Sequence, residues 1–268
     1  MVRELNCLSA GRDTIVHMKE TLIYAHRGAN TEAAENTRSA FDQSLVYAID
    51  GIETDIQLSR DEVAVLWHDR YLGKLNLPDK HIDDFEFARL RQMNFAAHFS
   101  ADAKAEGIVS LQEFIATYRQ RCRLLLEIKN REWEPRSRHE SKVRQVLDLA
   151  GASQGDAILV SSFNLDSLIF AHQCAPDFPL VYNFEPEQTL ADARRALAEQ
   201  SFLYGLCLPI ASLNAAMVSL LREHRKCIAV YTCNSDGEIA HALELGVDIL
   251  ISDVPQKALA MRAEMSKS

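Results

Sequence analysis

The sequence predicts an α/β fold, a (β/α)8 TIM barrel, and three observations carry this prediction. The chain has 268 residues, and a single α/β barrel takes about 250. Eight short apolar runs recur along it, and they are continuous rather than alternating, as expected for parallel strands covered on both faces. Amphipathic stretches of helical length lie between many of these runs, and this alternation favours one barrel.

The expected elements follow one another along a single domain, residues 21–268, after an N-terminal extension, residues 1–20. The expected strands are 22–25, 52–58, 124–128, 158–161, 180–184, 203–208, 228–232 and 248–252. The expected helices include 35–47, 138–150, 187–200, 213–224 and 236–245. Ser110, followed three residues later by Glu113, has the spacing of a capping box and predicts a helix start there.

Two segments do not fit a regular barrel. Asp55 and His68 are too close in sequence for a parallel strand with a crossover helix. The run Val63–Trp67 is therefore either the return arm of an antiparallel hairpin or an irregular extra strand, outside the eight. A turn centred on Asp61-Glu62 would set His68 opposite Asp55. The charged segment 69–108, with helical character near 85–93, is interpreted as a small insertion over the carboxyl-end mouth of the barrel.

Composition and charge narrow the function classes. The chain is 47% hydrophobic and 25% charged, as a folded globular protein is. Its net charge of −9 disfavours nucleic acid and membrane surfaces as partners, because both attract basic faces. No integral membrane segment or secretory signal is expected, because no apolar run is long enough and the N-terminus is polar. The cytoplasm is the expected location, and the oligomeric state stays open.

The cysteines are scattered along the chain without the paired spacing of a zinc site. We interpret them as reduced core thiols of a reducing compartment. They are Cys7, Cys122, Cys174, Cys207, Cys227 and Cys233.

Two carboxylates stand out in the stretch 51–69. Glu53 and Asp55 lie two residues apart in a strand-like run, so their side chains point to the same face. Like charges this close repel unless something neutralises them, and a hard divalent cation prefers carboxylate oxygens. The alternative is a surface hairpin whose acids face water.

Four motifs together resemble the glycerophosphodiester phosphodiesterase family. They read His26-Arg27-Gly28, Ala34-Glu35-Asn36-Thr37, Glu53-Thr54-Asp55 and His68-Asp69, in the order and spacing of that family. The histidine and the arginine lie at a strand end, which is also where a barrel enzyme places its catalytic residues. Taken alone, they could be a strand cap and a surface salt bridge.

The resemblance extends over about residues 20–258. Leu124–Lys129 matches the family's L-E-I-K segment and adds Glu127, although a strand-end salt bridge with Lys129 is the alternative for that carboxylate. Tyr231 stands where the family usually has Trp, and 246–255 matches the closing G-V-D segment. The family's R-T-T-like segment is absent after His68, which leaves the alcohol group of the substrate open.

The resemblance implies hydrolysis of glycerophosphodiesters to glycerol 3-phosphate and an alcohol. Glu53, Asp55 and Glu127 would hold one divalent cation, Mg²⁺ or Ca²⁺, and Arg27 and Lys129 would bind the phosphate. His26 and His68 would act as general acid and base, in an order that the sequence does not settle. Asn36 and Tyr231 are candidate substrate contacts. The nucleophile is water or the neighbouring glycerol hydroxyl.

Two rival functions are weighed against this one. A related phosphodiesterase could act on lysophospholipids or phosphoinositides, but that requires an apolar mouth. A non-catalytic binding protein on the same barrel would keep the fold without the chemistry. The charged residues of the insertion favour a small polar or cationic alcohol over an acyl chain. These residues are Asp79, Lys80, Asp83, Asp84, Glu86, Arg89 and Arg91.

Overall fold

The chain folds into a closed (β/α)8 barrel, as predicted. The computed structural model describes residues 20–100, 102–131, 133–151 and 157–267, so the expected extension lies almost wholly outside the described residues. The barrel strands are β1 (Leu22–His26), β2 (Gly51–Leu58), β4 (Arg123–Ile128), β5 (Ile158–Ser162), β6 (Leu180–Asn183), β7 (Gly205–Pro209), β8 (Cys227–Tyr231) and β9 (Ile249–Ser252). They pair in parallel in the order β1-β9-β8-β7-β6-β5-β4-β2, and a β1–β2 pairing closes the circle.

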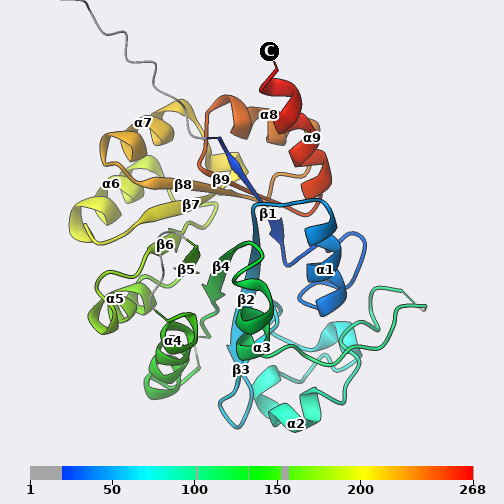
Figure 1. The fold of residues 1–268 in the computed structure, drawn as a ribbon. Helices are drawn as coiled ribbons and strands as arrows, with labels where there is room; N and C mark the ends of the chain where they lie inside the picture. The colour runs from blue at the N-terminus through cyan, green and yellow to red at the C-terminus, as the bar shows by residue number, and fades with distance from the viewer. Residues whose placement is uncertain (1–19, 101, 132, 152–156, 268) are drawn as a thin grey trace, which may run out of the picture.

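Helices form the outer ring of the barrel (Figure 1). They are α1 (Arg38–Val46), α3 (Leu111–Tyr118), α4 (Arg136–Ala150), α5 (Leu165–Cys174), α6 (Leu190–Glu199), α7 (Ala215–Glu223), α8 (Asp236–Glu244) and α9 (Pro255–Met265). Polar caps fix where several begin: Ser110 and Glu113 form the expected capping box of α3. Helix α1 starts three residues later than expected, because Thr37 is its N-cap and accepts a hydrogen bond from the Ala40 amide.

The run after β2 is an antiparallel strand outside the eight, β3 (Ala64–Leu66). The expected register was wrong by one residue. Trp67, not His68, lies opposite Asp55, and its amide donates to the Asp55 carbonyl oxygen at 3.0 Å. The cause is the turn, in which Glu62 adopts a positive φ of 59° and the ladder closes between Ser59 and Val63.

Residues 69–108 gather beside β3, on one side of the barrel (Figure 1). The described residues of this segment form two 3-10 turns, η1 (Gly73–Leu75) and η2 (Ile82–Asp84), and one short helix, α2 (Phe87–Leu90). Their apolar side chains pack with those of β3 and its flanks in a cluster separate from the main core: Val65, Trp67, Leu72, Ile82, Leu90, Phe95 and Ile108. The insertion therefore has a small core of its own.

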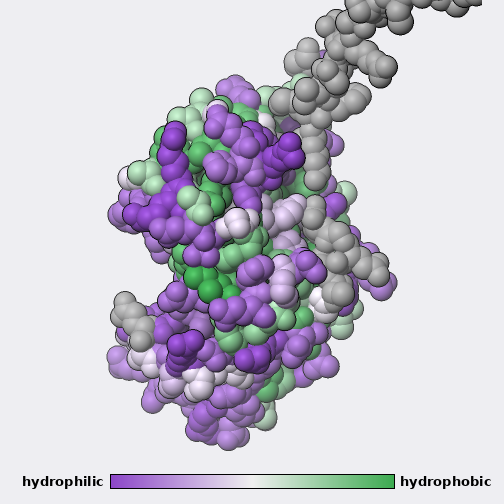
Figure 2. All heavy atoms as spheres, turned by 90° about the vertical axis from the view of Figure 1, so that its left-hand side faces the viewer, coloured by the Kyte–Doolittle hydropathy of each residue, from purple (hydrophilic) through white to green (hydrophobic). Residues whose placement is uncertain are grey.

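The surface on the side of α5 and α6 is mostly hydrophilic, with apolar side chains gathered at mid-height (Figure 2). Among the described residues, no helix is both long and apolar enough to cross a membrane. The five cysteines in this part of the chain are free thiols. Cys207 and Cys233 are buried as expected, whereas Cys174 is exposed and not a core thiol.

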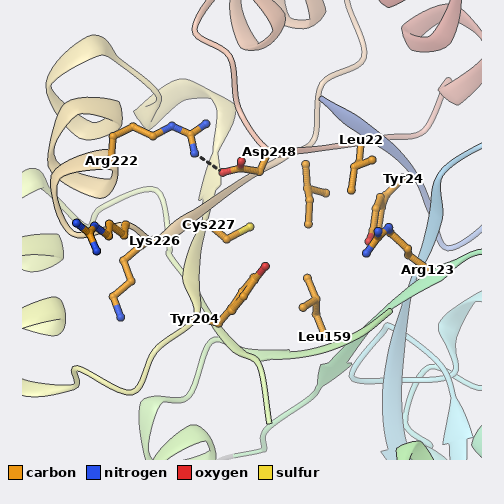
Figure 3. Close-up of a pocket in the computed structure, with 11 residues that line it drawn as sticks. Leu22, Tyr24, Arg123, Leu159, Tyr204, Arg222, Lys226, Cys227 and Asp248 are labelled. Atoms are coloured by element: carbon orange, nitrogen blue, oxygen red, sulfur yellow. Dashed lines mark hydrogen bonds and ion pairs between the residues drawn. The ribbon is translucent and has the colours of Figure 1, made fainter. Parts of the chain in front are cut away.

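A cavity of about 250 Å³ lies at the amino-terminal ends of the strands (Figure 3). Leu22, Leu159 and Ile249 contribute apolar walls, and Arg222 at its edge is paired with Asp248 at 2.7 Å. In barrel enzymes the chemistry lies at the other end, where the strands finish. The predicted site residues are at that other end.

Candidate active site

Strand register brings the predicted site residues together. His26 at the end of β1 is the register partner of Glu53 on β2. Asp55, two residues further along β2, is the register partner of Glu127 on β4. Parallel strands end at the same edge of the barrel, so the four side chains meet at its carboxyl-terminal mouth.

Three carboxylates form the floor of the site. One carboxylate oxygen from each of Glu53, Asp55 and Glu127 lies within 4.8 Å of the other two, and all three residues are buried. Burial, together with the negative charges of Asp55 and Glu127, raises the pKa of Glu53 well above its usual value. Neither carboxylate oxygen of Glu53 has a hydrogen-bond donor among the described residues.

Arg27 and Lys129 supply positive charge to this cluster. The Arg27 Nε atom lies 3.1 Å from Asp55, and the Lys129 ammonium lies 2.9 Å from the same carboxylate. Lys129 also pairs with Glu127, so the salt bridge that the sequence suggested does form. Burial alone would raise the pKa of Asp55, but Lys129 and Arg27 outweigh it and hold that pKa below its usual range. Three carboxylates thus face two cations.

This donor set fits a hard divalent cation. The three carboxylates offer oxygen donor atoms, which Mg²⁺ and Ca²⁺ prefer as ligands. The two orphaned oxygens of Glu53 are the observation that decides the fit, because a buried carboxylate without a donor is costly. The Lys129 ammonium does not remove that cost, because it pairs with Asp55 and Glu127.

His26 is held by the carboxylate of Asp253, a residue that was not among the predicted site residues. Its Nδ1 atom lies 2.6 Å from Asp253, while its Nε2 atom faces Glu53 at 3.8 Å. Asn30 and Asn234 donate to the same Asp253 carboxylate. Burial would raise the pKa of Asp253, but hydrogen bonds from His26 and the two asparagines lower it to about 2. An ionised Asp253 therefore orients the imidazole.

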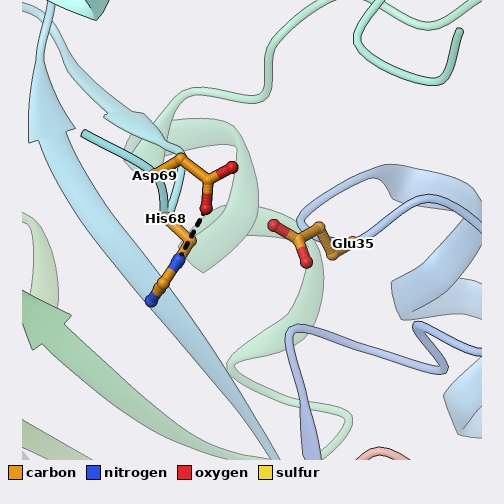
Figure 4. A group of neighbouring side chains, drawn as sticks. All are labelled: Glu35, His68 and Asp69. Atoms are coloured by element: carbon orange, nitrogen blue, oxygen red, sulfur yellow. Dashed lines mark hydrogen bonds and ion pairs between the residues drawn. The ribbon is translucent and has the colours of Figure 1, made fainter. Parts of the chain in front are cut away.

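His68 has a corresponding partner. Its Nδ1 atom lies 2.8 Å from Asp69, and the ring extends away from that carboxylate (Figure 4). The hydrogen bond from His68 lowers the pKa of Asp69 to about 2. Lys74 lies between Asp69 and Glu35, at 3.1 and 2.8 Å. Arg27 also pairs with Glu35 at 3.1 Å, so two cationic side chains balance the two carboxylates of the Glu35–His68–Asp69 group without a metal ion.

The pairing with β2 ends after Trp67, and this frees His68 to face the site. The Gln57 amide donates to the carbonyl oxygens of Trp67, His68 and Asp69 at 2.8, 3.2 and 3.0 Å. One side chain thus fixes the backbone on both sides of the histidine.

The site opens into a cavity of about 150 Å³. The two histidines, Arg27, Lys129, Glu53 and Glu127 line it together with Phe163, Tyr231 and other residues of the later strands. The Phe163 and Tyr231 rings meet edge to face, with centroids 5.8 Å apart. The Tyr231 hydroxyl donates to the Phe184 carbonyl oxygen, so Tyr231 presents only its ring to a ligand.

Asn36 does not line this cavity. Its amide donates to Asp55 at 2.9 Å, and its carbonyl oxygen accepts from the Thr54 hydroxyl at 2.7 Å. A positive φ of 57° places the side chain there. Position 28 requires glycine, because its φ is 85° and a Cβ there would lie 2.6 Å from the Ala40 backbone.

Sequence reasoning did not assign partners to the catalytic candidates. Asp253 lies 227 residues from His26 along the chain, so no local motif joins them. A signal was present, because Asp253 directly follows a predicted barrel strand. Asp69 was visible beside His68, but its role in holding the ring depends on side-chain geometry.

Comparison with known proteins agrees with this geometry. The model of the glycerophosphoryl diester phosphodiesterase family matches residues 26–257. A glycerophosphodiester phosphodiesterase of Bacillus altitudinis is 28% identical over 256 residues, which cover 91% of this chain and 99% of the relative. An Oleispira antarctica phosphodiesterase, solved with the product sn-glycerol-3-phosphate, is 26% identical with a TM-score of 0.80, over 90% of this chain and 96% of that one.

A glycerophosphodiester phosphodiesterase of Thermotoga maritima shares the fold, with a TM-score of 0.73 and 22% identity over 91% of this chain and all of that one (100%). The family match covers most of the chain and includes every motif that forms the site. The chain belongs to the glycerophosphoryl diester phosphodiesterase family and is a phosphoric diester hydrolase.

Proposed function

We propose that the protein hydrolyses glycerophosphodiesters to glycerol 3-phosphate and an alcohol, with the help of one divalent cation. The observation that carries the proposal is the shared cavity. Buried carboxylates, two cationic side chains and two carboxylate-held histidines all line it or its floor. Phosphodiester hydrolysis needs charge neutralisation, an activated nucleophile and a proton for the leaving alkoxide, and these groups supply all three.

Glu53, Asp55 and Glu127 would hold the cation, Mg²⁺ or Ca²⁺. When bound, it supplies a Lewis acid for the phosphoryl oxygens. Arg27 offers a planar fork of donors and Lys129 a point charge, so these two side chains bind and orient the phosphate. Asn36 keeps Asp55 in place and, by its position, serves the carboxylate rather than the substrate.

His26 and His68 would move the protons. One imidazole accepts the proton of the attacking hydroxyl as its oxygen forms the new bond to phosphorus. The other donates a proton to the alkoxide oxygen as the bond from phosphorus to that oxygen breaks. Asp253 and Asp69 hold the two rings through Nδ1, which leaves Nε2 for the reaction. The attacking hydroxyl is that of water or of the glycerol moiety itself.

The dimensions of the cavity favour a small head group. A cavity of about 150 Å³ with charged walls does not match an acyl chain, so lysophospholipids are the second choice. The free thiols of the described residues support a reducing location, and we place the protein in the cytoplasm.

A substrate panel tests the proposal. Soluble glycerophospho-alcohols and lysophospholipids are incubated with the protein, and release of glycerol 3-phosphate is measured. We expect release from the soluble esters and little from the lipids. Glu53→Gln should abolish most of it, whereas Glu86→Gln, which alters an exposed ion pair with Arg60, should not. Binding without release from any ester would favour the non-catalytic alternative.

A further inference from the structure

A second hollow adjoins the reaction cavity. It measures about 190 Å³ and shares His68 and Lys129 with that cavity. Its remaining lining residues are Gln57, Arg70, Asn130, Arg131 and Trp133. Because it begins at a catalytic candidate and a phosphate-binding candidate, it is placed to receive one of the two groups on the phosphate.

The charge of this hollow is positive. Arg70 and Arg131 line it in addition to Lys129, and its described lining residues include no carboxylate. Among the acids of the insertion, Asp84 accepts from the His81 amide at 2.9 Å and Glu86 pairs with Arg60, whereas Asp83 lies 3.9 Å from Arg131. The composition of the insertion favours a small polar or cationic alcohol, whereas the positively charged lining of the hollow opposes a cationic one.

The Arg131 side chain is buried and is not an exposed surface cation. Its side chain is only 8% exposed, and one terminal nitrogen is buried without a hydrogen-bond partner among the described residues. The other donates to the Arg70 carbonyl oxygen at 3.0 Å and lies 3.9 Å from Asp83. The ion pair with Asp83 is long, and the second terminal nitrogen has no partner among the described residues, so this buried guanidinium favours an additional anion.

The Trp133 ring lines the hollow and packs against further aromatic side chains outside it. The Arg70 guanidinium lies 4.0 Å from the centre of the Trp133 ring, and His81 lies between the Trp133 and Tyr71 rings, with centroids at 5.2 and 4.7 Å. Trp133 and Tyr71 remain 41% exposed. Stacking on Trp133 fixes the plane of the Arg70 guanidinium and its donors. A flexible surface arginine has no such fixed orientation.

We propose that this hollow is a subsite for a negatively charged leaving alcohol, one that carries a carboxylate or a phosphate monoester. Arg131 and Arg70 bind the anionic group, while the phosphodiester sits between His26 and His68. The proposal rests on the proposed function, because it names the class of glycerophosphodiester that the same site prefers.

Matched esters test it. Glycerol phosphodiesters are prepared from three two-carbon alcohols, glycolate (anionic), ethylene glycol (neutral) and ethanolamine (cationic), and from ethylene glycol phosphate. We expect the highest kcat/KM for the anionic esters and the lowest for the ethanolamine ester. The two anionic esters then show whether the subsite prefers a carboxylate or a phosphate.

Substitutions locate the effect. Arg70→Gln and Arg131→Gln should each lower kcat/KM for an anionic ester about tenfold, as expected for a lost charge-assisted hydrogen bond, and leave the neutral ester almost unchanged. Arg131→Lys should retain part of the preference. Arg144→Gln is the matched control, because Arg144 also stacks on a ring, Phe170 at 4.7 Å, but away from the hollow.

Equilibrium binding of the same esters in chelator gives a readout that needs no hydrolysis. A charge preference in binding that Arg70→Gln abolishes supports the subsite even if every ester resists hydrolysis, which would refute the proposed function alone. A preference for the neutral or cationic ester, or a ranking that neither arginine variant alters, would overturn the subsite.

Discussion

At the scale of single residues, each of the two histidines of the candidate site has a carboxylate partner. Asp253 holds His26, and Asp69 holds His68. The sequence motifs predicted both histidines, because each is adjacent to a recognisable neighbour at a strand end. They could not predict Asp253 as a partner, because the contact depends on the closure of β1 against β9.

Loss of either histidine should remove proton transfer. We expect His26→Ala and His68→Ala each to lower kcat by roughly two to four orders of magnitude, the usual contribution of a general acid or base. If they act in one relay, the double variant is little slower than either single variant. Steady-state release of glycerol 3-phosphate measures this, with exposed His224→Ala as control. Losses that multiply would contradict the relay.

Asp253 should link stability to pH. Its pKa of about 2 is below the usual value near 4, so its ionised form favours the folded state. This contribution, on the order of 1–2 kcal/mol given its partial exposure, is present above pH 4 and is lost as the pH falls towards 2. Urea unfolding of wild type and Asp253→Asn at several pH values measures it. A difference that stayed constant with pH would refute the linkage.

Asp253→Asn also tests the positioning of His26. An amide cannot offer the same charged acceptor to Nδ1, so the ring loses its fixed tautomer. We expect kcat to fall by at least about tenfold with little change in KM, as for other hydrolases whose carboxylate orients a histidine.

At the scale of elements, the positions of strands and helices along the chain follow from the hydrophobic pattern, but the register between neighbouring strands does not. The hairpin of β2 and β3 shows the difference. The sequence left the second run as either the return arm of a hairpin or an irregular extra strand. It forms the return arm, and a left-handed residue in the turn, Glu62, shifts the register by one from the expected pairing. His68 reaches the site all the same, because Gln57 holds the backbone beyond the last pair.

The capping box of α3 was both predicted and found, so its energy can be tested. Ser110→Ala removes the side-chain acceptor of the Glu113 amide, at 3.2 Å, and should cost about 1 kcal/mol. Denaturant unfolding measures the change. Ser39→Ala, at an exposed position within α1, is the control. Equal stability of the two variants would show that the cap contributes nothing.

At the scale of the whole molecule, the alternation of apolar runs and helices was enough to predict the barrel. What the pattern could not predict is which strand-end residues meet across it, because those contacts require closure. Phe163, which follows β5, contacts Tyr231 of β8 and lies over the ammonium of Lys129, which follows β4. The hollow with Arg131 also depends on closure, since it joins the insertion to the segment after β4.

The central claim is that a buried carboxylate cluster and two histidines form one hydrolytic site that depends on a divalent cation. Release of glycerol 3-phosphate from a soluble glycerophosphodiester is measured before chelation, after chelation and after Mg²⁺ or Ca²⁺ is restored. We expect loss of activity in chelator and its recovery with at least one cation, and no recovery in Glu53→Gln. Full activity of the metal-stripped protein would contradict it.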